Sequence, residues 1–233
     1  MPVPEMINSM PRVRYLIDII VIVLAYFGFD AAADALPLPD NFRIVIVVST
    51  LVKCLFLLFV WFCLRWRGDN LATVGLKKPR NWPLTIVGGV FYAAALFVGV
   101  YLLERAGFRR DMSAYVRFKG NLEFTVYQLG GIIVGAGFGE EFVFRGFLFH
   151  RLAILFGGSK AAWAMACVIQ AALFGAIHAY QNPMGMLLTG TIGLISGIVF
   201  LAIGRNLWVP IIAHTLYDSA RVVAFYLYGP PPW

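Results

Sequence analysis

The chain has 233 residues, of which 61% are hydrophobic and 13% are charged, and its mean hydropathy is +0.79. Soluble domains are about half apolar and about a quarter charged, so this composition excludes a soluble globular protein and indicates an integral membrane protein. No glycine-rich phosphate loop, nucleic-acid motif or repeat is present, so the net charge of +7 fits membrane-facing loops and not nucleic-acid binding.

The first apolar stretch, residues 15–33, follows a polar lead that ends in two arginines. This pattern resembles a cleavable signal peptide, but Asp18 within the stretch and the long lead favour a retained first span. The second stretch, 43–64, is long enough to cross a bilayer of about 30 Å. Lys53 lies near its middle and needs an ion partner or a water-filled cavity, and we expect a bundle-stabilising pair and not a catalytic role.

The connection after the second span is the most basic one near a membrane edge, with Arg65, Arg67, Lys77, Lys78 and Arg80. The positive-inside rule therefore predicts that this connection is cytoplasmic. Lys and Arg summed over alternate connections favour a cytoplasmic N-terminus, although the connection 104–121 after the third span (83–103) is also basic.

The remaining apolar segments are 122–156, 161–178, 184–203 and 207–228. The segment 122–156 exceeds one upright span, because a helix of that length rises about 50 Å. Its glycines could let it break or tilt, so one tilted helix and two shorter helices both remain open. The sequence predicts an all-α, polytopic transmembrane helix bundle of about seven to eight spans.

Glu140, Glu141 and Arg145 stand close together near the middle of this long apolar segment. Each charge at a helix centre costs roughly 2.5 to 3.5 kcal/mol on an insertion scale, and such charges are usually functional. Glu141 and Arg145 form an i,i+4 pair with the acid first, which is the favourable order. We infer that this pair holds the helix in place and leaves Glu140 free for chemistry, with a purely structural salt-bridge network as the alternative.

The three histidines, His150, His178 and His214, lie within or at the ends of apolar stretches, where imidazoles are rare. The i,i+4 spacing places His214 and Asp218 on one helical face, as proton transfer, metal binding or oxyanion binding requires. The rise of a helix per residue puts Glu140 and His178 at similar depths in the membrane, whereas His214, on a straight last helix, would not reach that depth. Either the glutamate helix projects beyond the bilayer or the last helix begins deep.

Three motifs follow one another on successive predicted helices: Glu140-Glu141-x-x-x-Arg145, Phe174-x-x-x-His178 and His214-x-x-x-Asp218. In these motifs and their order the chain resembles the CPBP family, the CAAX proteases and bacteriocin-processing enzymes also called Abi proteins. A short motif after the second span, Val74-Gly-Leu76, is also similar to one in the family. We expect one integral membrane domain (1–233), with N-terminal spans in 1–71 and a protease-like core in 72–218.

The resemblance implies a membrane-embedded endopeptidase, with no cofactor favoured. Glu140, assisted by His178, would activate a water molecule for attack on a peptide carbonyl, while His214 and Asp218 would flank the oxyanion. An ionised Asp218 would repel the oxyanion, so this residue must be protonated, orient His214 or bind a cationic group. Arg221, three residues further on, could also neutralise it.

Two alternatives remain open. Glu140, His178, His214 and Asp218 are candidate Zn²⁺ ligands, although the chain lacks an H-E-x-x-H motif, the strong zinc signature. The other alternative is a non-catalytic membrane protein, such as a transporter, a scaffold or a bacteriocin-immunity protein, because intramembrane acids and histidines form proton relays. Against a transporter, the charged motifs occur once and not in matched halves.

The expected partners are the lipid bilayer and a membrane-associated peptide or protein, prenylated or not. The short loops and the absence of a retrieval signal favour a multi-pass protein of the bacterial plasma membrane.

Overall fold

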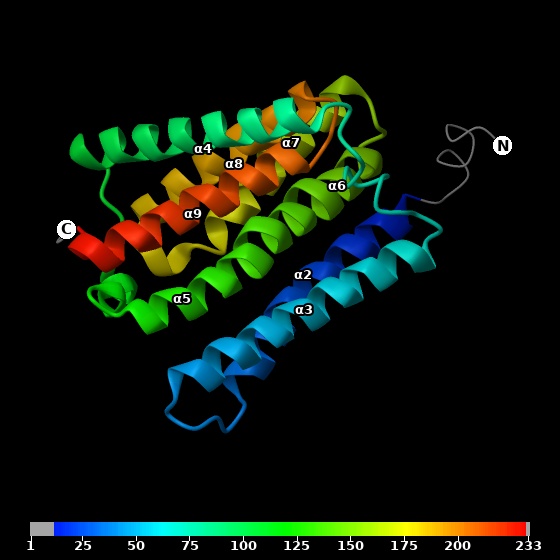
Figure 1. The fold of residues 1–233 in the computed structure, drawn as a ribbon. Helices are drawn as coiled ribbons and strands as arrows, with labels where there is room; N and C mark the ends of the chain where they lie inside the picture. The colour runs from blue at the N-terminus through cyan, green and yellow to red at the C-terminus, as the bar shows by residue number, and fades with distance from the viewer. Residues whose placement is uncertain (1–11, 232–233) are drawn as a thin grey trace.

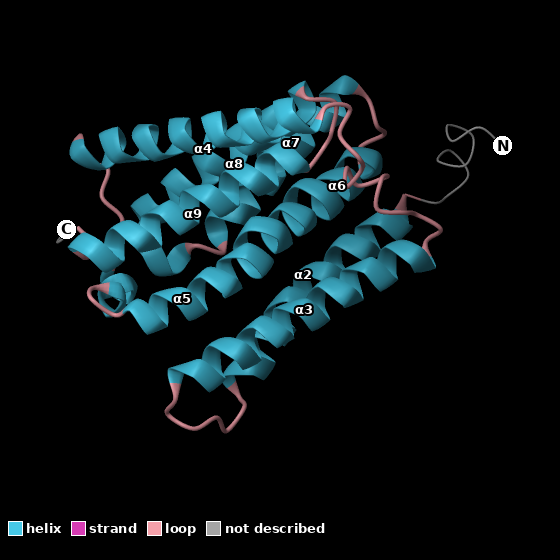
Figure 2. Ribbon diagram, in the orientation of Figure 1, coloured by secondary structure: helices cyan, strands magenta, loops and turns pink. Residues whose placement is uncertain are grey.

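The computed structural model describes residues 12–231, and this part of the chain is helical apart from its connections (Figure 2). Seven helical segments follow one another in this range: α2 (Val13–Asp34), α3 (Phe42–Trp66), α4 (Trp82–Arg105), the long segment 122–155, α7 (Lys160–Ala176), α8 (Asn182–Ala202) and α9 (Trp208–Tyr228). Two short 3₁₀ helices, η1 (Ser113–Phe118) and η3 (Ala179–Gln181), lie between them. The predicted fold class is confirmed, and each segment begins and ends within a few residues of the predicted span.

The outer surface of the bundle is apolar. Four of the described helical stretches are long and apolar enough to cross a membrane: α2, α3, α4 and Ala179–Ala202. Large apolar side chains such as Leu24, Leu58 and Phe91 point outward and are more than half exposed. Lipid tails solvate such a surface, whereas water does not, and the helices satisfy their own backbone groups. The chain is therefore an integral membrane protein.

The helices α2 and α3 form an antiparallel pair along one side of the bundle, next to the long segment (Figure 1). Asp18 of α2 is 7% exposed and lies 2.7 Å from the Arg67 guanidinium and 3.1 Å from that of Arg151. Removing one partner of a buried ion pair costs about 3–5 kcal/mol, because the other charge stays buried. The acid inside the first span thus links α2 to the rest of the bundle.

The long segment is one continuous helix and not two (Figure 1). It consists of α5 (Leu122–Gly131), η2 (Ile132–Leu148) and α6 (Phe149–Leu155), which follow one another without a break. The 17 residues of η2 are π-helical, with i→i+5 hydrogen bonds. Such winding is rare, usually limited to one turn and frequent at functional sites, and here it contains Glu140, Glu141 and Arg145.

The connection between α3 and α4 is fixed to the core at Gly75. Gly75 has φ +94°, and a Cβ atom there would lie 2.7 Å from the Phe200 ring, so only glycine fits. Its carbonyl accepts a hydrogen bond of 3.0 Å from the backbone N–H of Leu207, which contacts Gly146 of the long helix. The last helix therefore begins level with Gly146, while the long helix continues to Leu155. This offset brings His214 to the depth of the glutamates.

Candidate active site

The residues predicted to carry chemistry meet around one cavity of about 350 Å³. Its lining includes Glu140, His178, His214 and Asp218, which come from η2, the end of α7 and α9. The cavity extends from these residues toward the end of the bundle where α5 begins and α9 ends, through side chains of η1 and η3. His150 lies elsewhere, at the opposite end of the bundle.

His214 is held between two carboxylates. Its Nδ1 lies 2.8 Å from Oε1 of Glu141, and its Nε2 lies 3.3 Å from Oδ2 of Asp218. Glu141 is 1% exposed, and its Oε1 is also 3.3 Å from Nη1 of the fully buried Arg145. A carboxylate on one ring nitrogen fixes the orientation and tautomer of an imidazole. The spacing predicted the Glu141–Arg145 pair but not the bond to His214, which depends on how α9 packs against η2.

Glu140 has no hydrogen-bond partner for its Oε2 in the described part of the chain. This oxygen is buried and lies 3.9 Å from Nε2 of His214, while the Glu140 side chain is 23% exposed to the cavity. Buried polar atoms without a partner are few in native structures, and each marks a place for water, an ion or a ligand. Oε2 of Glu141 also lacks a hydrogen-bond partner in the described chain, so the two adjacent glutamates differ elsewhere: Glu141 bonds His214 through Oε1, and Glu140 lines the cavity.

His178 lies just beyond the end of α7 and is fixed by the backbone of that helix. Its Nδ1 lies 2.8 Å from the carbonyl oxygen of Phe174, and because a carbonyl only accepts, Nδ1 carries the proton. In the neutral ring, Nε2 is then a hydrogen-bond acceptor. The Phe174 ring also lies 4.0 Å from the Arg145 guanidinium and 4.9 Å from the His178 ring.

Lys53 lines the same cavity, and it has no ion pair among residues 12–231. The prediction of a bundle-stabilising ion pair for Lys53 is therefore wrong, and the lysine lines a cavity instead. The lysine side chain extends across Gly135 of η2, where a Cβ atom would lie 2.8 Å from the lysine Cδ. The other cations of the lining are engaged: Arg110 pairs with Glu104 at 2.6 Å, and Arg221 contacts Met112 Sδ at 3.0 Å and not Asp218.

Polar groups that sequence reasoning missed surround the outer part of the cavity. Thr189 Oγ1 and Gln181 Oε1 are buried there without a hydrogen-bond partner in the described chain. Burial raises the pKa of Tyr115 above its usual range, so its phenol stays a neutral hydrogen-bonding group. Such groups suit the N–H and C=O groups of a peptide backbone. No spacing in the sequence predicts them, because three different elements contribute them.

A second, smaller opening of about 70 Å³ meets the main cavity at Glu140 and Lys53, which line both. Its other walls are apolar and aromatic side chains of α2, α3 and η2: Tyr26, Phe56, Leu57, Val143 and Phe144. The site therefore has a polar side, toward one end of the bundle, and an apolar side, toward the α2–α3 pair.

The proposed zinc ligands do not form a zinc site as they are arranged here. In the described residues, no group of three or more His, Cys, Asp and Glu side chains has the geometry to hold a metal ion. The Nδ1 bonds of His214 to Glu141 and of His178 to a backbone carbonyl do not themselves exclude a metal, because histidines that bind metals commonly make such bonds through the other ring nitrogen. A zinc site would require these side chains to move.

A membrane-spanning helix bundle with acids and histidines around an internal polar cavity has the groups that proton transfer within a membrane requires. Residues 122–220 match the family model described as "Type II CAAX prenyl endopeptidase Rce1-like". This segment, which holds all three motifs, is therefore similar to CAAX prenyl endopeptidases of the Rce1-like type. No solved structure matches the chain.

Proposed function

We propose that the chain is an intramembrane endopeptidase that hydrolyses a peptide bond of a membrane-associated peptide or protein with water activated by Glu140. The observation that carries this proposal is the unpartnered Oε2 of Glu140, 3.9 Å from Nε2 of His214, on a carboxylate that lines the cavity. A carboxylate in this position can accept a proton from water as the water oxygen attacks a carbonyl carbon. The same proton then goes to the amine that leaves.

The histidines have different roles in this proposal. His178, with Nδ1 bonded to the Phe174 carbonyl, uses Nε2 to accept a hydrogen bond from the attacking water. His214, held by Glu141, donates from Nε2 to the oxyanion when its ring is protonated. Asp218 lies beside that nitrogen and orients it, which is one of the roles that the sequence left open.

The two openings favour a substrate with a polar peptide and an apolar anchor. The peptide occupies the polar cavity, and the anchor occupies the aromatic opening toward α2 and α3. Both openings meet at Glu140, where the bond would be cut. A prenylated cysteine directly before that bond fits this division, and so does a hydrophobic segment at the same position.

Lys53 is the cation of the cavity lining that has no ion pair within the described chain, and we assign it to the C-terminal carboxylate of the substrate. A CAAX-type cleavage removes three residues, so the terminal carboxylate lies only about 10 Å beyond the cut. An ammonium group at the middle of a span is costly, and a carboxylate partner offsets that cost.

The protein resides, in this proposal, in a bacterial plasma membrane with its N-terminus in the cytoplasm. The basic residues at the end of the bundle where α2 begins support this orientation: Arg14, Arg65, Arg67, Lys77, Lys78, Arg80, Lys160 and Arg205. The mouth of the catalytic cavity lies at the opposite end.

The test is cleavage of a fluorogenic, farnesylated CAAX peptide by the purified chain, compared with Glu140→Gln and His178→Ala. General-base catalysis contributes about 10²–10⁴-fold, so we expect a loss of at least about 100-fold in kcat for Glu140→Gln. Glu123→Gln is the matched control, since Glu123 lies on the same long helix and pairs with exposed Arg43, away from the cavity. Full activity in Glu140→Gln would contradict the proposal.

A chelator distinguishes a metal-independent peptidase from the zinc-dependent alternative. Activity that survives chelation supports the water-activating glutamate without metal. Inhibition by the chelator, reversed by zinc, would instead support the set Glu140, His178, His214 and Asp218 as ligands. If the wild type leaves the farnesylated peptide intact, membrane-associated peptides that accumulate in a Glu140→Gln strain identify the substrate.

A further inference from the structure

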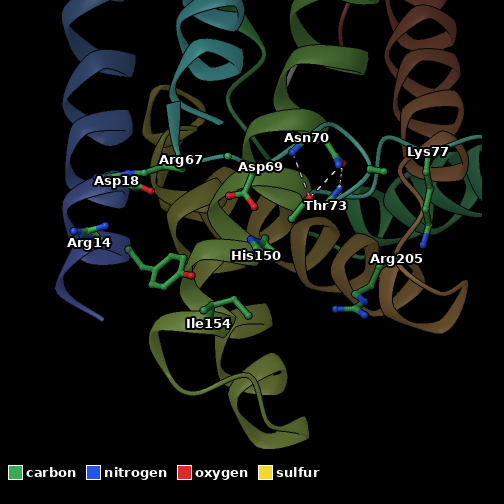
Figure 3. Close-up of a pocket in the computed structure, with 13 residues that line it drawn as sticks. Arg14, Asp18, Arg67, Asp69, Asn70, Thr73, Lys77, His150, Ile154 and Arg205 are labelled. Carbon is green, nitrogen blue, oxygen red and sulfur yellow. Dashed lines mark hydrogen bonds and ion pairs between the residues drawn. The ribbon is translucent and has the colours of Figure 1, made fainter. Parts of the chain in front are cut away.

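A second large cavity, of about 460 Å³, lies at the end of the bundle opposite the catalytic cavity. The start of α2, the connection between α3 and α4, α6 and the turn between α8 and α9 form its walls. Figure 3 shows its side chains arranged around the hollow, and most of the charged ones are basic. They are Arg14, Asp18, Arg67, Asp69, Lys77 and Arg205.

Both acids of this cavity are already neutralised. Asp18 pairs with Arg67 at 2.7 Å and with Arg151 at 3.1 Å, and Asp69 pairs with Arg151 at 2.6 Å. Arg151 is 1% exposed and lies behind the wall, and its Nη2 has no hydrogen-bond partner in the described chain. The two arginines therefore balance the two aspartates and leave no negative charge for the other cations.

Three cations remain without a carboxylate partner in the described residues: Arg14, Lys77 and Arg205. Lys77 Nζ donates to the Gly204 carbonyl at 3.0 Å, and the Arg205 guanidinium lies 4.7 Å from the Trp163 ring. These contacts position the side chains without removing their charge. The cavity thus combines an excess of three positive charges with a hollow between them.

The positions of Lys77 and Arg205 are fixed relative to each other. Asn206 Nδ2 donates to the Lys77 carbonyl at 3.0 Å, in addition to the bond from Lys77 to Gly204. Arg205 itself has φ +58°, a conformation that non-glycine residues rarely adopt. The cations therefore stand on a backbone that is bonded together before any ligand binds, which lowers the entropic cost of binding.

This cavity lies at the depth of lipid headgroups. Tryptophans gather at the same end of the helices: Trp66 is 74% exposed, and the rings of Trp82 and Trp208 are 5.2 Å apart. Tryptophan is enriched where the headgroups meet the hydrocarbon. Basic pockets between helices at this level suit phosphate-containing lipid headgroups, because Arg and Lys bind phosphate with charge-assisted hydrogen bonds.

We propose that this cavity binds the phosphate group of an anionic phospholipid. The bound headgroup contacts α2 through Arg14, the α3–α4 connection through Lys77 and the α8–α9 turn through Arg205. It therefore joins the α2–α3 pair to the helices that carry the catalytic residues, and it stabilises the folded bundle by mass action.

The test measures the thermal unfolding midpoint of the full chain in phosphatidylcholine nanodiscs, with and without phosphatidylglycerol. The cavity variant is Arg14→Gln/Lys77→Gln/Arg205→Asn, with Asn chosen because it tolerates positive φ. The matched control is Arg65→Gln/Lys78→Gln/Arg80→Gln, which removes three exposed charges at the same end but outside the cavity. Inorganic phosphate, added to nanodiscs without phosphatidylglycerol, tests a free anion as the ligand.

We expect phosphatidylglycerol to raise the midpoint by several degrees in the wild type and the control, and to leave the cavity variant unchanged. A midpoint for the cavity variant close to that of the control in phosphatidylcholine shows that it is folded. If the cavity variant keeps the full shift, or the control loses it equally, the lipid acts through diffuse attraction and the site is refuted. An equal shift with inorganic phosphate alone would also overturn the lipid assignment.

Discussion

At the scale of single residues, the adjacent glutamates have opposite environments. Glu141 bonds His214 at 2.8 Å and lies 3.3 Å from Arg145, and it is almost fully buried. Glu140 lines the cavity and leaves Oε2 unpartnered. One carboxylate therefore holds α9 against η2, while its neighbour is available to a substrate.

The first prediction separates these two roles. Glu141→Gln should lower both stability and activity, because it leaves the buried Arg145 without its carboxylate, a change that costs about 3–5 kcal/mol. Glu140→Gln should lower activity alone, because its Oε2 has no bond to lose. Unfolding in a denaturing detergent, monitored by circular dichroism, measures the stability of both variants, and the peptide-cleavage assay measures their activity. Equal destabilisation by the two variants would contradict this division.

The second prediction concerns Lys53. Lys53→Met should lower kcat/KM about 10-fold or more for a peptide that ends in a free carboxylate, because a charge-assisted bond contributes about 1.5–3 kcal/mol. The same variant should cleave the matching C-terminal amide as well as the wild type does. Lys53→Arg, which keeps the charge, is the control. A similar loss on both peptides would show that Lys53 serves the fold and not the substrate.

At the scale of elements, the catalytic geometry depends on close contact between η2 and α9. A Cβ atom at Gly137 would lie 2.9 Å from Cβ of Thr215 and closer still to its hydroxyl, and Thr215 follows His214 directly. Glycine at this position lets the two helices approach until His214 reaches Glu141.

The third prediction follows from this contact. Gly137→Ala should push α9 away from η2 and reduce both activity and the unfolding midpoint. Gly130→Ala, on the same long helix, meets nothing within 4 Å and should be neutral or stabilising by up to about 1 kcal/mol. The comparison cancels the intrinsic preference of alanine for helix. If Gly137→Ala cleaves peptide at the wild-type rate, the close contact is not needed for catalysis.

Features that depend on one segment could be predicted from the sequence, and features that depend on contacts between helices could not. The spans were predictable, because apolar length is a local property of each segment and the bilayer sets the length required. Three other features could not be predicted, because each depends on how different helices pack together. They are the bond between His214 and Glu141, the lack of an ion pair for Lys53 in the described chain, and the basic cavity lined by Arg14, Lys77 and Arg205. The π-helical winding of η2 was not predicted either, because nothing in the composition of this segment indicated it. The resemblance to a family grouped the site residues without showing which atoms meet.

At the scale of the whole molecule, the two cavities open at opposite ends, and the described chain begins at one end and finishes at the other (Figure 1). The side of the membrane on which the N-terminus lies therefore decides the side from which the catalytic cavity is reached. With the N-terminus in the cytoplasm, as proposed, the peptide part of a substrate would enter the catalytic cavity from the other side of the membrane.

The fourth prediction tests that orientation. Alkaline phosphatase fused after α9 should be active, and green fluorescent protein at the same point should be dark, because one crossing for each of the seven described helical segments would place the C-terminal end outside. Fusions after α3, at the opposite end, should show the reverse and serve as the control. The inverse pattern would refute the cytoplasmic N-terminus and place the mouth of the catalytic cavity on the cytoplasmic side of the membrane, where prenylated proteins occur.

The aromatic opening beside Glu140 means that a substrate's anchor can stay in the bilayer while its peptide is cut. The protein would then encounter its substrate as a solute in two dimensions. Turnover would follow the mole fraction of substrate in the lipid phase and not its amount per volume of buffer. Diluting a fixed quantity of anchored peptide with neutral carrier lipid would slow cleavage, whereas diluting the whole suspension of vesicles with buffer would leave the rate per enzyme unchanged.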